Sequence, residues 1–196
     1  MRSWPATLQH DLIKLRPIRY RDQAAWWKIR RQNADWLKPW DATLPDGSGS
    51  SMQSFFEMVM SWRAQAKDGR MMPFAIEYDN HFVGQVTVSG IVQGAARWAE
   101  IGYWLDHAHA GRNIMPISVA LVCDHLFETA RLHRVQIAIR PENANSLRVV
   151  SKLGFTKVGY APGYLHINGE WADHEIFQLL TEDVPEGVLN RFLRSQ

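Results

Sequence analysis

Hydrophobic and polar residues alternate along this chain in two rhythms, a period of two that predicts strands and a period near 3.6 that predicts helices. The stretch "DLIKLRPI" follows the first rhythm, and Pro17 closes it as an edge-compatible strand. Two tight turns are also expected, at Asp79-Asn80 and at Asn168-Gly169, the second being the strongest hairpin signal in the chain. Strands are predicted within 11–18, on both sides of the turn in 72–92, and at 97–106, 134–139, 155–167 and 170–180.

The helical rhythm occurs in five stretches. One of them, "SMQSFFEMVMSWRAQAKDG", places Phe55, Met58, Val59 and Trp62 on one face, and a glycine ends it. Gly154 is the expected C-cap of a later helix. The predicted helices cover 21–37, 51–69, 113–132, 145–154 and 182–193.

This order of elements predicts the fold class. A strand and two helices precede a three-stranded antiparallel meander, which is followed by helix, strand, helix and a C-terminal hairpin. The order is typical of an α+β, or mixed α/β, fold with one mostly antiparallel sheet and helices on both faces. It differs from the regular alternation of a doubly wound nucleotide-binding sheet. With 196 residues, 46% of them hydrophobic, the chain is expected to form one domain over 1–196.

Composition excludes several classes of protein. A net charge of +2 indicates no global attraction to nucleic acid. A single cysteine, Cys123, excludes a disulfide framework and a zinc site built on several thiolates. His107 and His109 lack a nearby acid or thiol pattern, so no metal site is expected. The chain shows neither a signal peptide nor a membrane span, and a cytoplasmic protein is expected.

Four of the nine tryptophans fall close together, at positions 26, 27, 36 and 40. Clustered aromatic side chains anchor a hydrophobic core or form the wall of a substrate site, and both readings stay open.

Two strand-to-helix joins carry the candidate chemistry. In "EIGYWLDHAHAGRNIMPIS", the unpaired N–H groups of the helix N-terminus, with Arg112, are suited to a pyrophosphate, although an ordinary loop would look similar. In "RVQIAIRPENANSLRVVSKLGF", Asn143 can cap the helix, and Ser146 lies one turn further on the same face. Capping explains Asn143 but leaves the serine unexplained.

Taken together, "EIGYWLD", "HAGRNIMPISVALVCDHLFE" and "PENANSLRVVSKLGF" resemble the GNAT acyltransferase superfamily. Within it the chain is most similar to the RimJ/RimL-type ribosomal-protein N-terminal acetyltransferases. The opening "LRPIRYRDQAAWWKIRRQNADWLKPW" resembles that branch as well, so the similarity extends over nearly the whole chain.

The resemblance implies acetyl-coenzyme A (acetyl-CoA) as donor, bound where the strands at 97–106 and 134–139 splay apart. The main chain of Tyr103, Trp104 and Leu105 would pair with the pantetheine amides. The pyrophosphate loop would comprise Ala110, Gly111, Arg112, Asn113, Ile114 and Met115. The pattern has glycines where Asn113 and Met115 stand, so Asn113 would need a left-handed backbone and Met115 a side chain turned away from the phosphates. Asn143 would reach the pantetheine arm, and Ser146 would lie near the thioester sulfur.

The same resemblance suggests roles in the chemistry. Glu100 is the candidate general base, and a solvated acid at the start of a strand is the competing explanation. Glu77, Glu142 and Glu175 are weaker candidates. Ser146 would return a proton to the leaving thiolate, and the main-chain amides from Ile101 to Tyr103 would polarise the carbonyl.

The acceptor is expected between the N-terminal helices and the C-terminal hairpin. Asn33, Trp36 and Trp40 would contact it from one side, and Tyr164, His166 and Trp171 from the other. A simple cross-strand pair explains His166 and Trp171 equally well.

The leading hypothesis is an acetyl-CoA-dependent N-acetyltransferase that modifies a protein N-terminal amine, acting as a monomer or homodimer without nucleic acid or membrane. One alternative keeps the donor but acetylates a small amine, such as a polyamine or an aminoglycoside. The N-terminal helices offer few acids to line such a pocket, namely Asp22, Asp35, Asp41 and Glu57, which favours a peptide. The other alternative is a non-catalytic, coenzyme A-binding protein of this fold.

Overall fold

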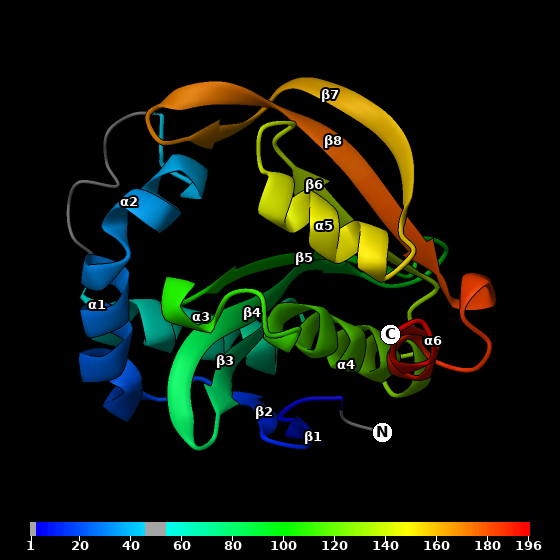
Figure 1. Ribbon diagram of the computed structural model, residues 1–196, viewed down its shortest axis with the longest axis horizontal. Coiled ribbons are helices and arrows are strands. Elements are labelled where there is room, and N and C mark those ends of the chain that lie inside the picture. Colours follow the sequence, from blue (N-terminus) through cyan, green and yellow to red (C-terminus); the bar gives the residue numbers. More distant parts are fainter. Residues whose placement is uncertain (1–2, 46–53) are drawn as a thin grey trace.

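The computed structural model of the protein describes residues 3–45 and 54–196 (Figure 1). The strands in these residues are β1 (Leu8–His10), β2 (Ile13–Pro17), β3 (Met72–Tyr78), β4 (His81–Val92), β5 (Trp98–Leu105), β6 (Arg134–Ile139), β7 (Thr156–Ile167) and β8 (Glu170–Leu180). The α-helices are α1 (Gln23–Gln32), α2 (Ala34–Leu37), α3 (Phe55–Lys67), α4 (Ile114–Glu128), α5 (Ala144–Lys152) and α6 (Val188–Arg194). Short 3-10 turns are η1 (Tyr20–Asp22), η2 (Lys38–Trp40), η4 (His107–His109) and η5 (Thr181–Asp183).

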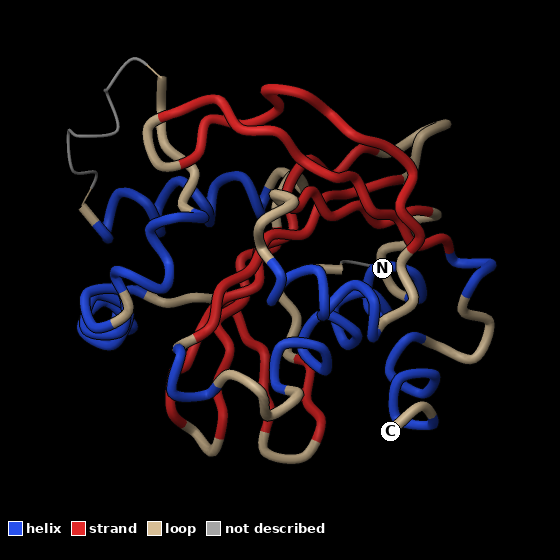
Figure 2. Tube along the Cα trace, turned by 45° about the horizontal axis from the view of Figure 1, so that its top comes forward, coloured by secondary structure: helices blue, strands red, loops and turns tan. Residues whose placement is uncertain are grey.

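All of these strands belong to one sheet in the order β1-β2-β3-β4-β5-β6-β8-β7. Only β5 and β6 pair in parallel, and every other neighbouring pair is antiparallel. Figure 2 shows helices on both sides of the twisted sheet. The predicted mixed α/β fold with a mostly antiparallel sheet is therefore confirmed.

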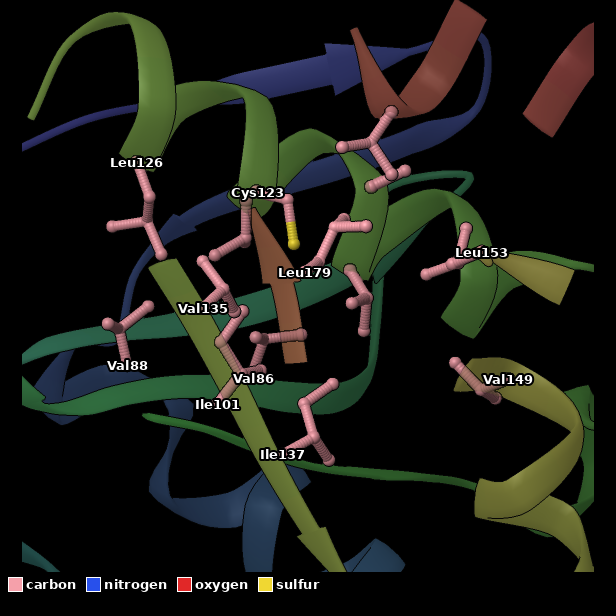
Figure 3. Close-up of a cluster of buried hydrophobic side chains, with 14 of the residues drawn as sticks. Val86, Val88, Ile101, Cys123, Leu126, Val135, Ile137, Val149, Leu153 and Leu179 are labelled. Atoms are coloured by element: carbon pink, nitrogen blue, oxygen red, sulfur yellow. The ribbon is translucent and has the colours of Figure 1, made fainter. Parts of the chain in front are cut away.

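The larger core lies where α4, α5 and α6 cover the sheet. In Figure 3, Cys123 and Leu126 of α4 point toward Val135 and Leu179 of the sheet, and Val149 of α5 joins the same cluster. Burying an aliphatic side chain of this kind contributes about 1.5–3 kcal/mol. Burial also raises the pKa of the Cys123 thiol, so this cysteine is an inert core residue.

The opposite face of the sheet carries α1 and α3. Phe55 and Val59 of α3 are buried against Ile18 and Ala75, and several aromatic side chains pack around them, among them Trp26, Trp27 and Trp62. The capping box of Ser54 and Glu57 explains where α3 begins, and Gly69, with φ 72°, follows its end. The predicted start of this helix, at 51–53, lies outside the described residues.

Three predicted helices differ from the structure. The helix expected at 113–132 already ends at Glu128 in α4. The helix expected at 21–37 is divided at Asn33, whose side chain donates to Ile29 O at 2.9 Å and so ends α1. The helix expected at 182–193 begins only at Val188, because Pro185 and Gly187, with φ 89°, interrupt the chain before it. Strand β1 was not predicted, since three residues give too short a pattern to recognise.

The parallel pair β5–β6 separates soon after it forms. Its register holds for three residue pairs, the last being Glu100 with Gln136, whereas β5 continues to Leu105 and β6 to Ile139. The predicted splay of these two strands is confirmed, and it leaves one edge of β5 without a partner strand.

The β7–β8 hairpin extends beyond the splayed strands and reaches α2 (Figure 1). Its tip is fastened to the segment after η2, where Thr43 N donates to His166 O and Asn168 N donates to Asp41 O, both at 2.9 Å. Ala42 and Ile167 form an isolated bridge there. The hairpin and the N-terminal helices thus enclose the space above the splay. In the described part of the chain, no helix has the length and hydropathy to cross a bilayer.

Candidate active site

A cavity of about 520 Å³ occupies the space beside the free edge of β5. Tyr103, Trp104 and Leu105 line it from β5, and Asn143, Ser146 and Lys152 line it from α5 and its N-terminus. Ala110, Gly111, Asn113, Ile114 and Met115 close one end, and Trp36 and Trp40 close another. All of these residues except Lys152 were predicted, on separate segments of the sequence, and the fold brings them to one cavity. Arg112 is exposed and is not part of the lining.

The main chain of β5 presents hydrogen-bonding groups to this cavity. Asp106 N donates to Val83 O of β4 at 2.8 Å, so by strand alternation the main-chain groups of Tyr103 and Leu105 are directed to the opposite edge. Trp36 Nε1 already donates to Leu105 O at 3.2 Å on that side. The N–H and C=O of Tyr103 lie beyond the last β5–β6 pair, so no strand satisfies them there.

The loop before α4 has the backbone that an anion site requires. Gly111 has φ 77° and Asn113 has φ 56°, so Asn113 takes the left-handed conformation that was expected of it. Met115 is only 6% exposed and belongs to the main core, and it also borders the cavity. Lys152 Nζ lies 2.7 Å from Asn113 Oδ1, which places a cation beside the N-terminus of α4.

The second predicted join has the expected local structure. Asn143 caps α5, since its Oδ1 accepts from Ser146 N at 3.1 Å, and Gly154 follows the helix with φ 67°. The hydroxyl of Tyr103, whose pKa is raised by burial, donates to Ser146 O at 3.5 Å. These contacts fix Ser146 at the edge of β5, where it borders the cavity.

A second cavity, of about 200 Å³, extends from the same place into the gap between β5 and β6. It shares Trp40, Gly102, Tyr103, Asn143 and Ser146 with the first cavity. A Cβ atom added at Gly102 would meet nothing within 4 Å, so the missing side chain keeps this junction open. Most of the described residues that line it are apolar, and the polar ones include Arg140 and His174 but no carboxylate.

Glu100 lies on the same face of β5 as Gly102, as strand alternation predicted, but it lines neither cavity. Its Oε1 accepts from Tyr164 OH at 2.9 Å and from Gln136 Nε2 at 3.1 Å. Burial, and then the hydrogen bond to Glu100, raise the pKa of Tyr164. The ring of Tyr164 also contacts His174 edge-on, with centroids 5.7 Å apart. The four polar residues Glu100, Gln136, Tyr164 and His174 therefore form a connected layer beneath the second cavity.

The predicted acceptor residues are divided by the structure. Trp36 and Trp40 line the cavities, whereas Trp26 and Trp27 belong to the core, so the tryptophan cluster is divided between the two. Asn33 is 7% exposed and lines neither cavity, because it bonds to Ile29 O, Asp106 Oδ1 and His107 N. It thereby ties α1 to the end of β5.

At the hairpin tip, His166 pairs with Trp171, and their ring centroids lie 5.5 Å apart. His166 Nδ1 is also 2.8 Å from Thr43 Oγ1. The cross-strand pair is thus present, and neither residue lines a cavity. The contact between His166 and Thr43 helps to hold the tip against the N-terminal segment.

Sequence reasoning missed His174, Arg140, Arg148 and Lys152, all of which line a cavity. A signal existed for His174, since it is a polar residue between Ala172 and Ile176 on the inward face of the last strand. Among the described residues no group of three or more His, Cys, Asp and Glu side chains is placed to hold a metal ion.

Comparison with known proteins agrees with this arrangement. Residues 13–156 match the acetyltransferase (GNAT) domain. The chain is 30% identical over 178 residues to the probable N-acetyltransferase YjcK of Bacillus subtilis (strain 168). The aligned region covers 90% of this chain and 98% of that protein. It is 26% identical to the ribosomal protein uS5-alanine N-acetyltransferase of Escherichia coli (strain K12), covering 92% of this chain and 93% of that one.

Among solved structures, RimJ of Mycobacterium smegmatis in complex with CoA-disulfide superimposes with a TM-score of 0.92 at 34% identity, over 98% of this chain and 96% of that one. The chain therefore belongs to the GNAT acetyltransferase family. Within that family it is of the RimJ/RimL type, related to the ribosomal-protein acetyltransferases. The resemblance read from the sequence is confirmed.

Proposed function

We propose that the protein transfers the acetyl group of acetyl-CoA to the N-terminal α-amine of a protein or peptide. The observation that carries the proposal is the junction of two cavities at Gly102, Tyr103 and Ser146. A long donor fits the larger cavity, an amine enters through the smaller one, and the thioester lies where they meet. The relatives support this donor, since the solved RimJ binds a form of CoA.

The first cavity offers each part of the donor a partner. The N–H and C=O of Tyr103 extend the edge of β5 to the pantetheine amides, as a strand would. The loop from Ala110 to Met115 and the start of α4 hold the pyrophosphate, with the positive charge of Lys152 nearby. Asn143 uses its Oδ1 for the helix cap, which leaves Nδ2 to donate to the pantetheine arm.

The second cavity favours a peptide over a polyamine or an aminoglycoside. A polycationic acceptor needs carboxylates. The described residues that line the second cavity include the cationic Arg140 but no carboxylate. Among the described residues that line the first cavity the one acid is Asp41, and it is already paired with Arg30. A volume near 200 Å³ with Ile137, Leu165 and Ile167 around it suits a small first side chain. The name of the relative that modifies alanine of uS5 agrees with that size.

An α-amine suits the chemistry as well. Its pKa is near ~8 against ~10.4 for lysine, so roughly a tenth is unprotonated at neutral pH and only a modest base is needed. The carbonyl carbon is attacked at the edge of β5, where the main-chain amides from Ile101 to Tyr103 were predicted to stabilise the developing oxyanion. Ser146, which borders both cavities, supplies the proton to the departing thiolate. The sequence predicted Glu100 as the base, but Glu100 lines neither cavity, so it could reach the amine only through a water molecule.

The test is thiol release from acetyl-CoA with a panel of peptides that differ only in their first residue. Peptides beginning with alanine or serine are expected to react fastest, and the same peptides with a blocked N-terminus but an intact lysine are expected to be inert. Spermidine and an aminoglycoside are assayed in parallel as the alternative acceptors. Faster turnover of these small amines than of every peptide would overturn the proposed acceptor. If neither coenzyme A nor acetyl-CoA raised the melting temperature, the donor assignment would fail too.

A further inference from the structure

The strongest unassigned feature of the molecule is His174 on β8. It is only 3% exposed, yet it lines the second cavity, through which the acceptor enters in the proposed function. By strand alternation it lies on the same face as Ala172 and Ile176. Ile176 pairs with Ala138 of β6, and Glu100 of β5 pairs with Gln136, which lies two residues before Ala138 and therefore on the same face. His174 and Glu100 thus share one face of the sheet.

The contacts of the ring determine which nitrogen is available. Nδ1 lies 3.0 Å from Ala172 O, and a carbonyl oxygen only accepts, so Nδ1 carries the hydrogen. The neutral ring then presents a lone pair on Nε2, for which the described residues provide no hydrogen-bond partner. Because His174 lines the second cavity, this nitrogen is available to a group that enters there.

We propose that His174 Nε2 receives the proton of the acceptor's α-ammonium group, and that Glu100 acts as a positioning residue. Glu100 lines neither cavity and touches His174 only through Tyr164, which donates to Glu100 at 2.9 Å. Tyr164 therefore holds the imidazole from one side while Ala172 O fixes its rotation. This inference rests on the proposed function, whose acceptor cavity it uses.

The protons are conserved in the proposed acetyl transfer. Nε2 takes one proton from the ammonium, and the freed lone pair forms the C–N bond to the thioester carbonyl. The C–S bond breaks with its electron pair on sulfur, and a second proton passes from the new amide nitrogen to that thiolate through Ser146. The imidazolium then releases its proton to water, so the products are one amide, one thiol and one proton.

The electrostatic surroundings keep the ring in the state that a base needs. Burial is the largest effect and lowers the pKa of His174, and the charge of Arg140 lowers it too. The hydrogen bond to Ala172 O, Asp173 and Glu142 oppose these effects, but the net pKa is lowered. Tyr164 is the other titratable group packed against the ring, and its raised pKa keeps it uncharged. The imidazole is thus neutral at pH 7.

The decisive variant is His174→Asn, because its side-chain amide can still donate to Ala172 O but cannot accept a proton. At pH 7 we expect kcat/KM for an alanine-terminated peptide to fall about 10²-fold, with the affinity for acetyl-CoA unchanged. The deficit should shrink toward pH 9.5, where the amine loses its proton unaided. A purely structural role would give a deficit that does not change with pH.

The matched control is His81→Asn. His81 Nδ1 makes the same contact to a carbonyl two residues earlier, Asp79 O at 2.7 Å, but in an exposed turn away from the cavities, so turnover should not change. If His174→Asn fails to fold, imidazole ¹⁵N NMR of the wild type replaces it. Adding the peptide to the coenzyme A complex should shift the Nε2 resonance of His174, and an unmoved resonance would overturn the inference.

The outcomes separate this inference from the proposed function. If the wild type acetylated peptides and His174→Asn did so at a rate within twofold of the wild type, only the role of His174 would be overturned. If the wild type acetylated only a small amine, and the variant did so far more slowly, the peptide acceptor would be wrong and the role of His174 would stand. A wild type silent toward every amine would overturn both.

Discussion

The hydroxyl of Tyr164 donates to the carboxylate of Glu100 across 2.9 Å, although the two residues lie on β7 and β5, with β8 and β6 between these strands in the sheet. The hydrogen bond closes the polar layer beneath the second cavity. It also occupies the oxygen, Oε1, that already accepts from Gln136. The carboxylate is thereby held in one orientation below the junction of the two cavities.

Tyr164→Phe tests whether Glu100 acts directly or through this contact. Losing a part-buried hydrogen bond should lower the free energy of unfolding by about 0.5–1.5 kcal/mol. If Glu100 is a positioning residue, kcat/KM should fall about three- to tenfold, because His174 loses its support. An increase in kcat/KM would contradict this, since it would mean that the released carboxylate is the base. Peptide kinetics and urea unfolding measure the two effects.

Glu100→Gln should lower turnover more than it weakens the donor. The amide can still accept from Tyr164 but removes the negative charge beneath the acceptor cavity, so kcat should fall at least about tenfold. The dissociation constant of coenzyme A, measured by calorimetry, should stay within about twofold, because Glu100 does not line the larger cavity. A variant with full turnover would remove Glu100 from the mechanism.

Gly102→Val should separate folding from catalysis. A Cβ atom at this position meets nothing within 4 Å, so the melting temperature should hardly change. The added side chain would project into the junction of the cavities, and peptide acetylation should fall at least about 10²-fold. Gly84→Ala is the contrast, because its Cβ would lie 2.5 Å from Trp104 O and should destabilise the fold. Normal activity in Gly102→Val would place the reaction elsewhere.

Lys152→Ala should affect donor binding alone. The ammonium lies 2.7 Å from Asn113 Oδ1 at the N-terminus of α4, where the pyrophosphate is proposed to bind. We expect the dissociation constant of coenzyme A to rise about fivefold at low salt, and the difference from wild type to narrow as salt is added. The turnover at saturating acetyl-CoA should be unchanged. Lys67→Ala, on the exposed surface of α3, is the control, and equal effects of both variants would refute a specific contact.

The buried His174 should make the fold sensitive to acid. Because its pKa is lowered in the folded state, the unfolded chain binds a proton first as the pH falls below about 6.5. The contribution of His174 to the free energy of unfolding is therefore complete above that pH and decreases between it and the lower folded pKa. Urea unfolding at pH 7.5, 6 and 5 should show the stability difference between wild type and His174→Asn narrowing toward acid. Parallel curves would contradict the burial of a neutral imidazole.

The local structure of the site was predictable because it depends on neighbours in the sequence. Asn143 caps α5 through a residue three positions away, and Gly154 takes a left-handed backbone that glycine adopts freely. Asn113 stands where the family pattern has a glycine, and its left-handed φ follows from a conformation that asparagine tolerates. Such short-range effects need no knowledge of the fold.

Other expectations depended on partners that a linear pattern does not contain. Asn33 looked like an acceptor contact, but its hydrogen bonds to Asp106 and His107 connect residues more than seventy positions apart. His174 looked like one polar residue in a strand, and only the pairing of β8 with β6 turned it toward a cavity. Glu100 was correctly placed on its strand face, yet its distance from both cavities follows from where β5 and β6 separate.

By itself, the sequence determined the strands other than β1, most of the helices, the caps at both joins and, through its motifs, the family. The tertiary structure decided which of the expected side chains share a cavity, that two cavities meet at Gly102, and that a histidine beside them keeps a free nitrogen. Periodicity and capping are set by residues within a turn or two of each other. A cavity instead exists where packing leaves space between distant segments, and that depends on all of them at once.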